Sequence, residues 1–232
     1  MQTRPVLCYI TSREQLPDSV DQPQISVQKA DANLGHRCNA LLEKIGEAAR
    51  AGVDVVQLRE KDLSGQALEK LALAAVEVIR RNSADDGGSR TKLLINGRVD
   101  VALAVGAEGV HLPAHDLSAA EVRVIWKHAR PGTSPMISVA CHTVGEVRTA
   151  AEADVDFALF APVFRKKDAP GVTATGIEGL REACRAPVRV LALGGVTLAN
   201  ARACLDAGAA GIAAIRLFQD HDIADIVREL RG

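Results

Sequence analysis

The sequence predicts a single (β/α)8 (TIM) barrel of the α/β class, and three observations lead to this fold. Short apolar segments alternate eight times with longer segments of helical periodicity. The chain has 232 residues, a normal length for one such barrel. No low-complexity linker divides it, so we expect one domain over residues 1–232.

Apolar runs and capping residues give the expected elements in chain order. The expected strands lie at residues 6–11, 53–59, 93–96, 109–113, 136–141, 155–162, 188–193 and 211–215. The expected helices lie at residues 37–51, 64–82, 99–105, 118–129, 144–153, 177–185, 197–207 and 223–230. Ser64 and Ser118 can cap two of these helices, and Gly52, Gly106 and Gly208 can end three others.

One segment, residues 12–35, does not follow this alternation. It is polar, carries Pro17 and Pro23, and is longer than most connections in compact domains. We expect an irregular insertion after the first strand that crosses one face of the barrel. A surface insertion without function and a lid over the site are both compatible with it.

Composition excludes several classes of partner. Lys and Arg number 28 and Asp and Glu number 29, giving a net charge of −1, and only 3% of residues are aromatic. We therefore expect no nucleic-acid partner and no membrane partner. The five cysteines form no CxxC motif, and the first residues lack a signal-peptide layout, which favours a reducing cytoplasm. A homo-oligomer is compatible with the sequence.

The segments that follow the expected strands are far more polar than the strands themselves. They are residues 59–61, 96–98, 111–116, 141–143, 164–176, 194–195 and 215–216. Because the carboxyl ends of barrel strands share one rim, we expect these segments to converge on a site.

Gln57, Arg59 and Lys61 alternate along the end of the second expected strand. Side chains two positions apart point to the same face of a strand. The three would present an amide, a planar guanidinium and a point charge to one anion. We interpret them as phosphate- or diphosphate-binding residues. The alternative is a solvated set of salt bridges with Glu60 and Asp62.

Asp116, after the fourth expected strand, is a candidate Mg²⁺ ligand or an ion-pair partner for the cations of the second strand. A hard cation prefers at least one carboxylate together with phosphate oxygens and waters. The neighbouring rim position is Gly97, which offers no carboxylate. We interpret the nearby His111 as a hydrogen-bonded structural histidine.

Cys141 and His142 end the fifth expected strand. Histidine has the intrinsic pKa for proton transfer near neutrality, so His142 is our candidate general acid/base, with a structural role as the alternative. We interpret Cys141 as a packing residue.

The basic run Arg165–Lys167 that follows the sixth strand can bind phosphate or form a solvated surface loop.

Gly194 and Gly195 follow the seventh expected strand, and Ile215 and Arg216 follow the eighth. Two glycines allow positive φ and close approach of a ligand to the backbone, and Thr197 can cap the next helix. Barrels often bind phosphate with the loops after these two strands. We therefore expect a phosphate site here. A tight turn without a ligand is the alternative for the two glycines.

These positions resemble motifs of the thiamine phosphate synthase/TenI superfamily, over nearly the whole chain from Val6 to Phe218 except residues 12–35. The matching motifs are Gln57–Lys61, Asn96–Asp100, Gly106–His111, Ala192–Thr197 with Asn200, and Ala207–Ile212. The superfamily contains a synthase, which joins hydroxymethylpyrimidine diphosphate to a thiazole phosphate and releases pyrophosphate with Mg²⁺. It also contains the TenI-type tautomerase, which isomerises a carboxylated thiazole phosphate.

The resemblance implies roles for individual residues. In a synthase, the diphosphate would lie with Gln57, Arg59, Lys61 and Asn96, the thiazole phosphate with Gly195, Ile215 and Arg216, and Mg²⁺ with Asp116. In a tautomerase, His142 would move the proton, Arg59 and Lys61 would meet the substrate carboxylate, and no metal cofactor would be needed.

Departures from the synthase pattern favour the TenI branch. Synthases have an Asp metal ligand where this chain has Gly97, a serine where it has Ala140, and a different loop where it has Arg165–Asp168. Asn-Gly-Arg-Val-Asp at 96–100 and His-Leu-Pro at 111–113 resemble TenI. We therefore expect a thiazole tautomerase. The alternatives are a Mg²⁺-dependent synthase and a non-catalytic regulator that binds a phosphorylated small molecule.

Overall fold

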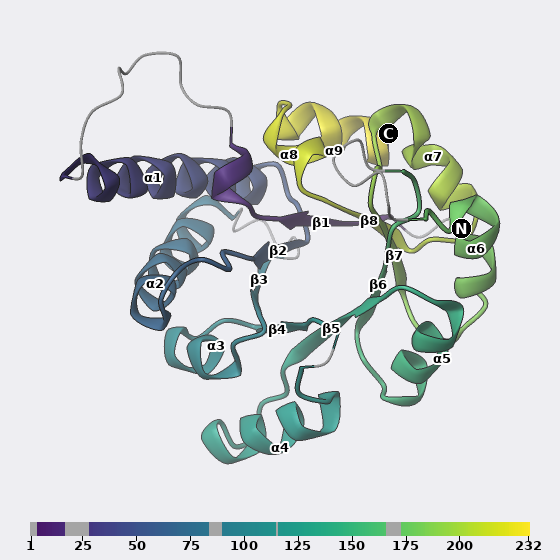
Figure 1. Ribbon diagram of the computed structural model, residues 1–232, viewed down its shortest axis with the longest axis horizontal. Helices are drawn as coiled ribbons and strands as arrows, with labels where there is room; N and C mark the ends of the chain where they lie inside the picture. Colours follow the sequence, from purple (N-terminus) through teal and green to yellow (C-terminus); the bar gives the residue numbers. More distant parts are fainter. Residues whose placement is uncertain (1–3, 17–27, 84–89, 115, 166–172) are drawn as a thin grey trace.

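The chain folds into a closed barrel of parallel strands surrounded by helices (Figure 1). The computed structural model describes residues 4–16, 28–83, 90–114, 116–165 and 173–232, with side chains described from residue 35 onward in the first long helix. In the described part of the chain, eight strands pair in sequence order and the last pairs with the first. The (β/α)8 prediction is confirmed.

The strand bounds are β1 Val6–Ile10, β2 Val55–Leu58, β3 Lys92–Asn96, β4 Gly109–Leu112, β5 Met136–Cys141, β6 Phe157–Phe160, β7 Val190–Leu193 and β8 Gly211–Ala214. The helix bounds are η1 (a 3₁₀ helix) Arg13–Gln15, α1 Gln28–Arg50, α2 Gly65–Asn82, α3 Val99–Val105, α4 Ala119–Ala129, α5 Val144–Glu152, α6 Gly176–Ala183, α7 Leu198–Asp206, α8 Arg216–Gln219 and α9 Ile223–Arg231.

Two expected boundaries were wrong. The predicted irregular insertion over residues 12–35 contains η1 and the first turns of α1, which begins at Gln28 rather than at Arg37. Residues 28–36 include good helix formers but only one large apolar residue, Leu34, so they carry little hydrophobic periodicity. Residues 17–27 lie outside the described part. The short helix α8 was also not expected.

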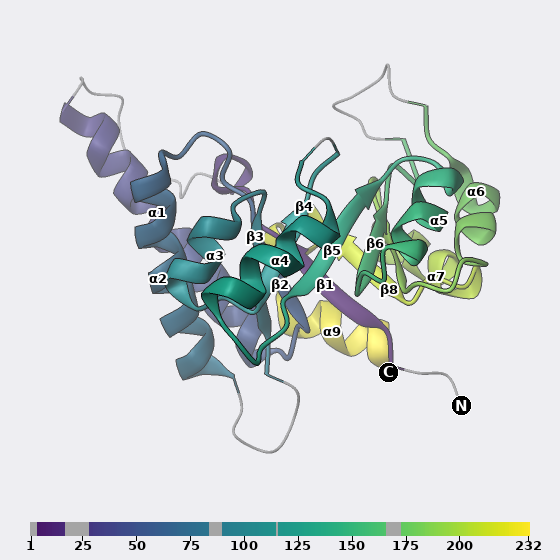
Figure 2. The same cartoon turned by 90° about the horizontal axis from the view of Figure 1, so that it is seen from below.

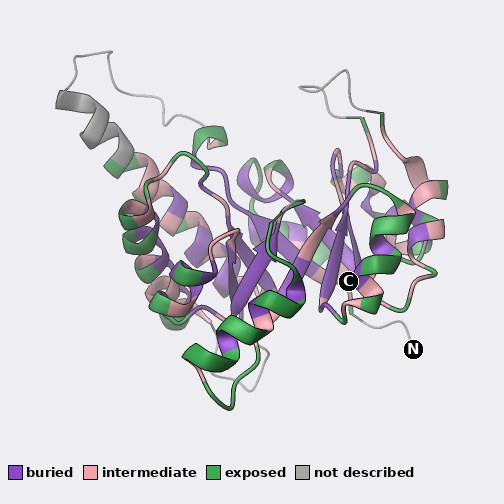
Figure 3. Cartoon of the chain, turned by 60° about the horizontal axis from the view of Figure 1, so that its bottom comes forward, coloured by how far each residue is buried: buried purple, intermediate pink, exposed green. Residues whose placement is uncertain are grey.

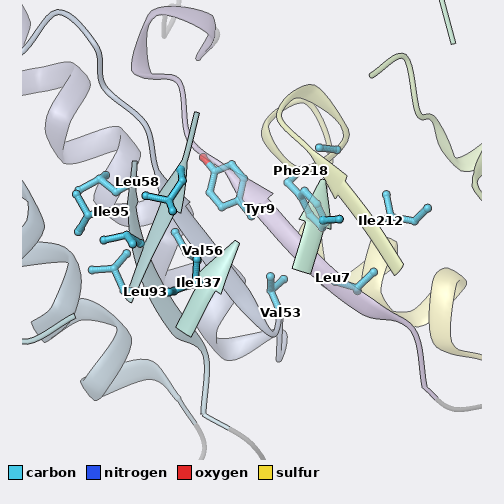
Figure 4. Packing of buried hydrophobic residues seen from close by; sticks show 14 of the residues in the cluster. Leu7, Tyr9, Val53, Val56, Leu58, Leu93, Ile95, Ile137, Ile212 and Phe218 are labelled. Atoms are coloured by element: carbon cyan, nitrogen blue, oxygen red, sulfur yellow. The ribbon is translucent and has the colours of Figure 1, made fainter. Parts of the chain in front are cut away.

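Alternation along the strands produces two buried layers. The inward-facing side chains fill the barrel with Cys8, Ile10, Val55, Leu94, Phe157, Leu159, Leu191 and Ala213. The outward-facing side chains pack against the helices, as Figure 4 shows for Leu7, Tyr9, Val56 and their neighbours. The strands are buried, whereas the outer faces of the helices are exposed (Figure 3).

Local capping follows the predicted signals. Ser64 accepts a hydrogen bond from the Ala67 amide, and Ser118 forms a capping box with Glu121. Each strand runs from the side of the barrel where the C-terminus lies toward the opposite rim (Figure 2). The candidate site residues follow the carboxyl ends of the strands at that rim.

Two global expectations concern membranes and cysteines. Among the described helices, none is long and apolar enough to cross a membrane. All five cysteines are free thiols.

Candidate functional site

The loops after β7 and β8 line a cavity of about 490 Å³, which we call the β7–β8 pocket. Four predicted phosphate-binding residues contribute to it: Gly194, Gly195, Ile215 and Arg216. The structure therefore brings these four together, and α8 follows directly as a short extra helix. This arrangement, with backbone amides, a helix N-terminus and a guanidinium, suits a phosphate group.

Gly195 cannot be replaced without strain in this pocket. Its φ is +66°, and a Cβ there would lie 2.8 Å from Phe164 Cβ and 3.0 Å from the Arg165 carbonyl oxygen. The backbone of the β7 loop thus packs directly against the loop that follows β6. Glycine provides both the left-handed conformation and the close approach.

Asn200 fixes the shape of the same loop. Its Oδ1 accepts from the Thr197 amide at 2.8 Å, and its Nδ2 donates to the Gly195 carbonyl at 3.0 Å. Thr197 and Asn200 also form a capping box at the start of α7. Thr197 is the N-cap residue of α7, as predicted, and the Asn200 side chain holds the Gly195 carbonyl against the helix start.

Gln57, Arg59, Lys61 and Asn96 form what we call the β2–β3 group. Gln57 Nε2 donates to Asn96 Oδ1 at 3.0 Å, so the structure brings these two amides together. Gln57 Oε1 is buried and has no hydrogen-bond partner in the described part of the chain. That free acceptor suits an amino or hydroxyl donor of a ligand, and Nε2 has a second N–H besides the one that Asn96 accepts.

The acidic and the basic residues after β2 differ in their ion-pair partners. Glu60 is buried and pairs with Arg13, and Asp62 pairs with the same guanidinium. The alternative of a salt-bridge set within 59–62 was therefore wrong, because the carboxylates turn to Arg13. In the described part, neither Arg59, which is half-buried, nor Lys61, which is exposed, forms a salt bridge with a carboxylate.

His111 is buried inside the barrel next to the β2–β3 group. Its Nδ1 lies 2.9 Å from Ser138 Oγ. Burial, reinforced by the charge of Arg59, lowers the pKa of His111 to about 3. The ring therefore stays neutral at physiological pH, and the predicted hydrogen bond of His111 is confirmed.

Asp116 and Gly97 lie together at the rim. Gly97 has a φ of +64°, and a Cβ there would lie 2.9 Å from Asp116 Oδ2. The other oxygen, Oδ1, accepts from the Leu117 amide at 2.8 Å. Among the described residues, no cluster of three His, Cys, Asp or Glu side chains could hold a metal. One carboxylate fits Mg²⁺ that shares its coordination with substrate phosphates and waters, rather than an ion held by protein alone.

His142 is exposed at the end of β5, where its Nδ1 lies 2.8 Å from the Ala161 carbonyl oxygen. Because a carbonyl only accepts, Nδ1 carries the proton, and in the neutral ring Nε2 keeps a free lone pair. Cys141 beside it is buried, and burial raises the pKa of its thiol to about 12. This agrees with the interpretation of Cys141 as a packing residue.

The basic run after β6 is only partly described. Arg165 is exposed and lines the β7–β8 pocket, whereas Lys166 and Lys167 lie outside the described residues.

Sequence reasoning missed four residues that the structure brings to the same rim. They are Arg13 and Gln15 of η1, Gln219 of α8, and His221. Arg13 and Gln15 directly follow β1, so the strand-end rule could have identified them.

Comparisons with known proteins agree with this geometry. The family model described as thiamine monophosphate synthase matches residues 30–218. The chain belongs to this family. A thiamine-phosphate synthase of Caldanaerobacter subterraneus is 36% identical over 197 residues, covering 82% of this chain and 86% of the relative.

Further relatives extend the same pattern. A putative thiamine-phosphate synthase of Geobacter sulfurreducens is 40% identical over 194 residues, covering 82% of this chain and 85% of the relative. The solved structure of a thiamine phosphate pyrophosphorylase from Pyrococcus furiosus is 26% identical with a TM-score of 0.71, covering 97% of this chain and 93% of that one. The chain thus matches most of the length of these relatives, and its family is an enzyme family of thiamine biosynthesis.

Proposed function

We propose that this protein joins hydroxymethylpyrimidine diphosphate to a thiazole phosphate and releases pyrophosphate. The observation that carries the proposal is the presence of two separate groups of candidate anion-binding residues on one rim, which we call the two anion-binding sets. The β2–β3 group and the β7–β8 pocket are separated by β1 on one side and by β4 to β6 on the other. Two phosphorylated substrates need two such sets, and the relatives above carry the synthase name.

Each set has a defined task in this reaction. Arg59 and Lys61 neutralise the diphosphate, and their charges stabilise the pyrophosphate as it leaves. Gly195 and Arg216 hold the phosphate of the thiazole, which fixes the nucleophilic ring nitrogen near the reacting carbon. Mg²⁺ bound by Asp116 together with the diphosphate would add charge neutralisation to the same leaving group.

The barrel mouth between the two sets suits two different rings. On the β2 to β5 side it is polar, with the Gln57–Asn96 pair and the neutral His111. On the other side the inward side chains are apolar, including Ile10, Leu193 and Ile215. A ring with hydrogen-bonding edges fits the first side, and a less polar ring fits the second.

The test is formation of thiamine phosphate from the two precursors with purified protein. We expect Mg²⁺-dependent product, and we expect Arg59→Gln to lower kcat/KM by roughly 10²-fold through loss of charge stabilisation. Arg80→Gln, which removes an exposed ion pair with Glu77 on α2, is the matched control. No product with both precursors and Mg²⁺ present would refute the proposal.

A specific observation favours a second function, the thiazole tautomerase. Gly97 removes one of the two metal-binding carboxylates that the resemblance implies, and Nε2 of His142 is available to accept a proton. A proton shift needs one held phosphate and one titrating group, without a metal. Isomerisation of the carboxylated thiazole phosphate that is lost in His142→Ala would support this function.

Running the two assays side by side separates the candidates. Synthase activity that survives in His142→Ala assigns the transferase reaction, and isomerisation without thiamine phosphate formation assigns the tautomerase. Phosphate binding by calorimetry with both assays blank leaves the non-catalytic regulator. For each of the three we expect a cytoplasmic protein, in keeping with the five free thiols.

A further inference from the structure

A buried polar network lies at the carboxyl end of β1, outside both anion-binding sets. Arg13 and Glu60 have side chains that are only 5% and 2% exposed. Arg13 Nη1 lies 3.2 Å from Glu60 Oε2, and the Arg13 amide donates to the same oxygen at 3.1 Å. The guanidinium also pairs with Asp62. One arginine therefore holds both acidic residues of the loop after β2.

The network reaches the cations of the β2–β3 group through the backbone. Thr11 Oγ1 donates to Glu60 Oε1 at 2.6 Å and accepts from the Arg59 amide at 2.9 Å. Glu60 is the residue between Arg59 and Lys61, past the end of β2 at Leu58, so its fixed carboxylate restrains the backbone that carries both neighbours.

The segment of residues 12–15, which contains the short helix η1, also contacts the other anion-binding set. Gln219 of α8 donates from Nε2 to the Ser12 carbonyl at 2.9 Å, and both residues are buried. Gln15, at the end of η1, lines the β7–β8 pocket. Residues 12–15 thus connect the loop after β2 with the helix that follows β8.

Stability alone does not account for this network. Buried ion pairs lose hydration, and apolar residues of similar size often stabilise a fold equally well. Burial raises the pKa of the Glu60 carboxyl even though Thr11 and Arg13 donate hydrogen bonds to it. The ionised pair is therefore held at a cost, which is reasonable where its geometry serves a neighbouring site.

We propose that Arg13 and Glu60 are positioning residues that hold Arg59 and Lys61 at a fixed place relative to the β7–β8 pocket. They act through Thr11 on one side and through the Ser12–Gln219 hydrogen bond on the other. The proposal rests on the proposed function, because it assigns diphosphate binding to Arg59 and Lys61. It adds residues that touch neither substrate.

A purely electrostatic role and a positioning role of Glu60 predict opposite effects of Glu60→Gln on pyrophosphate binding. Glu60 lies between two cations, so removing its charge strengthens pyrophosphate binding if only electrostatics matter. If Glu60 positions the cations, losing the ion pair with Arg13 weakens binding instead. We expect a Kd for pyrophosphate about tenfold higher than in the wild type, measured by calorimetry at pH 7.5.

Thr11→Val tests the same link without a change of charge. The substitution keeps the shape of the side chain and removes the hydroxyl between Glu60 and Arg59. We expect roughly three- to tenfold weaker pyrophosphate binding. The matched control is Arg231→Gln, which removes a largely buried Arg231–Asp54 ion pair at the opposite end of the barrel. It is expected to lower the midpoint of urea unfolding but leave the Kd of the folded protein unchanged.

The outcomes are distinct. Equal or tighter pyrophosphate binding by folded Glu60→Gln and Thr11→Val would overturn the positioning role while leaving the proposed function standing. A wild type that binds no pyrophosphate contradicts the proposed function itself, and the positioning role with it. Recovery of binding in the doubly neutral Arg13→Gln/Glu60→Gln variant, relative to Glu60→Gln alone, supports the ion pair as the element that sets the geometry.

Discussion

Acidification from pH 8 to pH 5 should destabilise the protein through His111. This ring is 6% exposed, and burial together with the charge of Arg59 lowers its pKa to about 3. In the unfolded chain a histidine has a pKa of about 6.5. As the pH falls through about 6.5, the unfolded state binds a proton that the folded state does not bind, so stability falls with pH.

The two pKa values set the magnitude. At pH 8 both states are neutral and the contribution is close to zero. A pH of 5 lies about 1.5 units below the pKa of the unfolded histidine. At 1.36 kcal/mol per unit, protonation of the unfolded state lowers the free energy of unfolding by about 2 kcal/mol. For a domain of this size that corresponds to a drop in Tm of about 4–8 °C. The full loss, about 5 kcal/mol, is reached only near pH 3.

The assay is urea unfolding of the wild type and His111→Gln at pH 8 and at pH 5. Carboxylates also titrate toward acid pH, but their effect is common to both proteins and cancels in the difference. We expect the wild type to lose about 2 kcal/mol more than His111→Gln. His128→Gln, at an exposed position on α4, should behave like the wild type. Equal losses in the wild type and His111→Gln would refute the assigned pKa and its cause.

Three substitutions test the loops of the site. Gly195→Ala should cost about 2–3 kcal/mol in urea unfolding and abolish phosphate binding in calorimetry, because its Cβ meets Phe164 at 2.8 Å at positive φ. Gly97→Asp should lower stability by about 1–2 kcal/mol next to Asp116, yet increase the rise in Tm on adding Mg²⁺. Asn200→Ala should cost about 1 kcal/mol and weaken phosphate binding, since it removes the cap and the bond to Gly195.

The regular elements were predictable because they bury apolar faces. Strands such as β3 and β7 are apolar runs with inward and outward layers, and α3 is bounded by an identifiable Gly106 with a φ of +77°. The two short helices were not predictable, since η1 and α8 have too few residues to show a period. The start of α1 was also missed, because its first turns carry few apolar residues.

The site was predictable where it depends on local alternation and not where it depends on distant contacts. The inward direction of Gln57 follows from strand alternation, a rule that needs only the sequence, and the structure pairs it with Asn96. Because β2 ends at Leu58, the shared face of Arg59 and Lys61 stays a prediction. The partner of Glu60 could not be inferred, because Arg13 lies 47 positions away in the chain. The closeness of Gly97 and Asp116 likewise depends on two neighbouring strands rather than on any local pattern.

Gly97 and Asp116 are best understood as one structural feature. The Asp116 carboxylate lies where a side chain at residue 97 would be, so the missing carboxylate and the position of the remaining one are coupled. A single exposed carboxylate holds Mg²⁺ weakly, and phosphate oxygens supply the ligands it lacks. Metal and diphosphate should therefore each raise the affinity for the other, by the same factor. Under the proposed synthase function, this rim would depend on its substrate to assemble the metal site, and no second carboxylate would be needed.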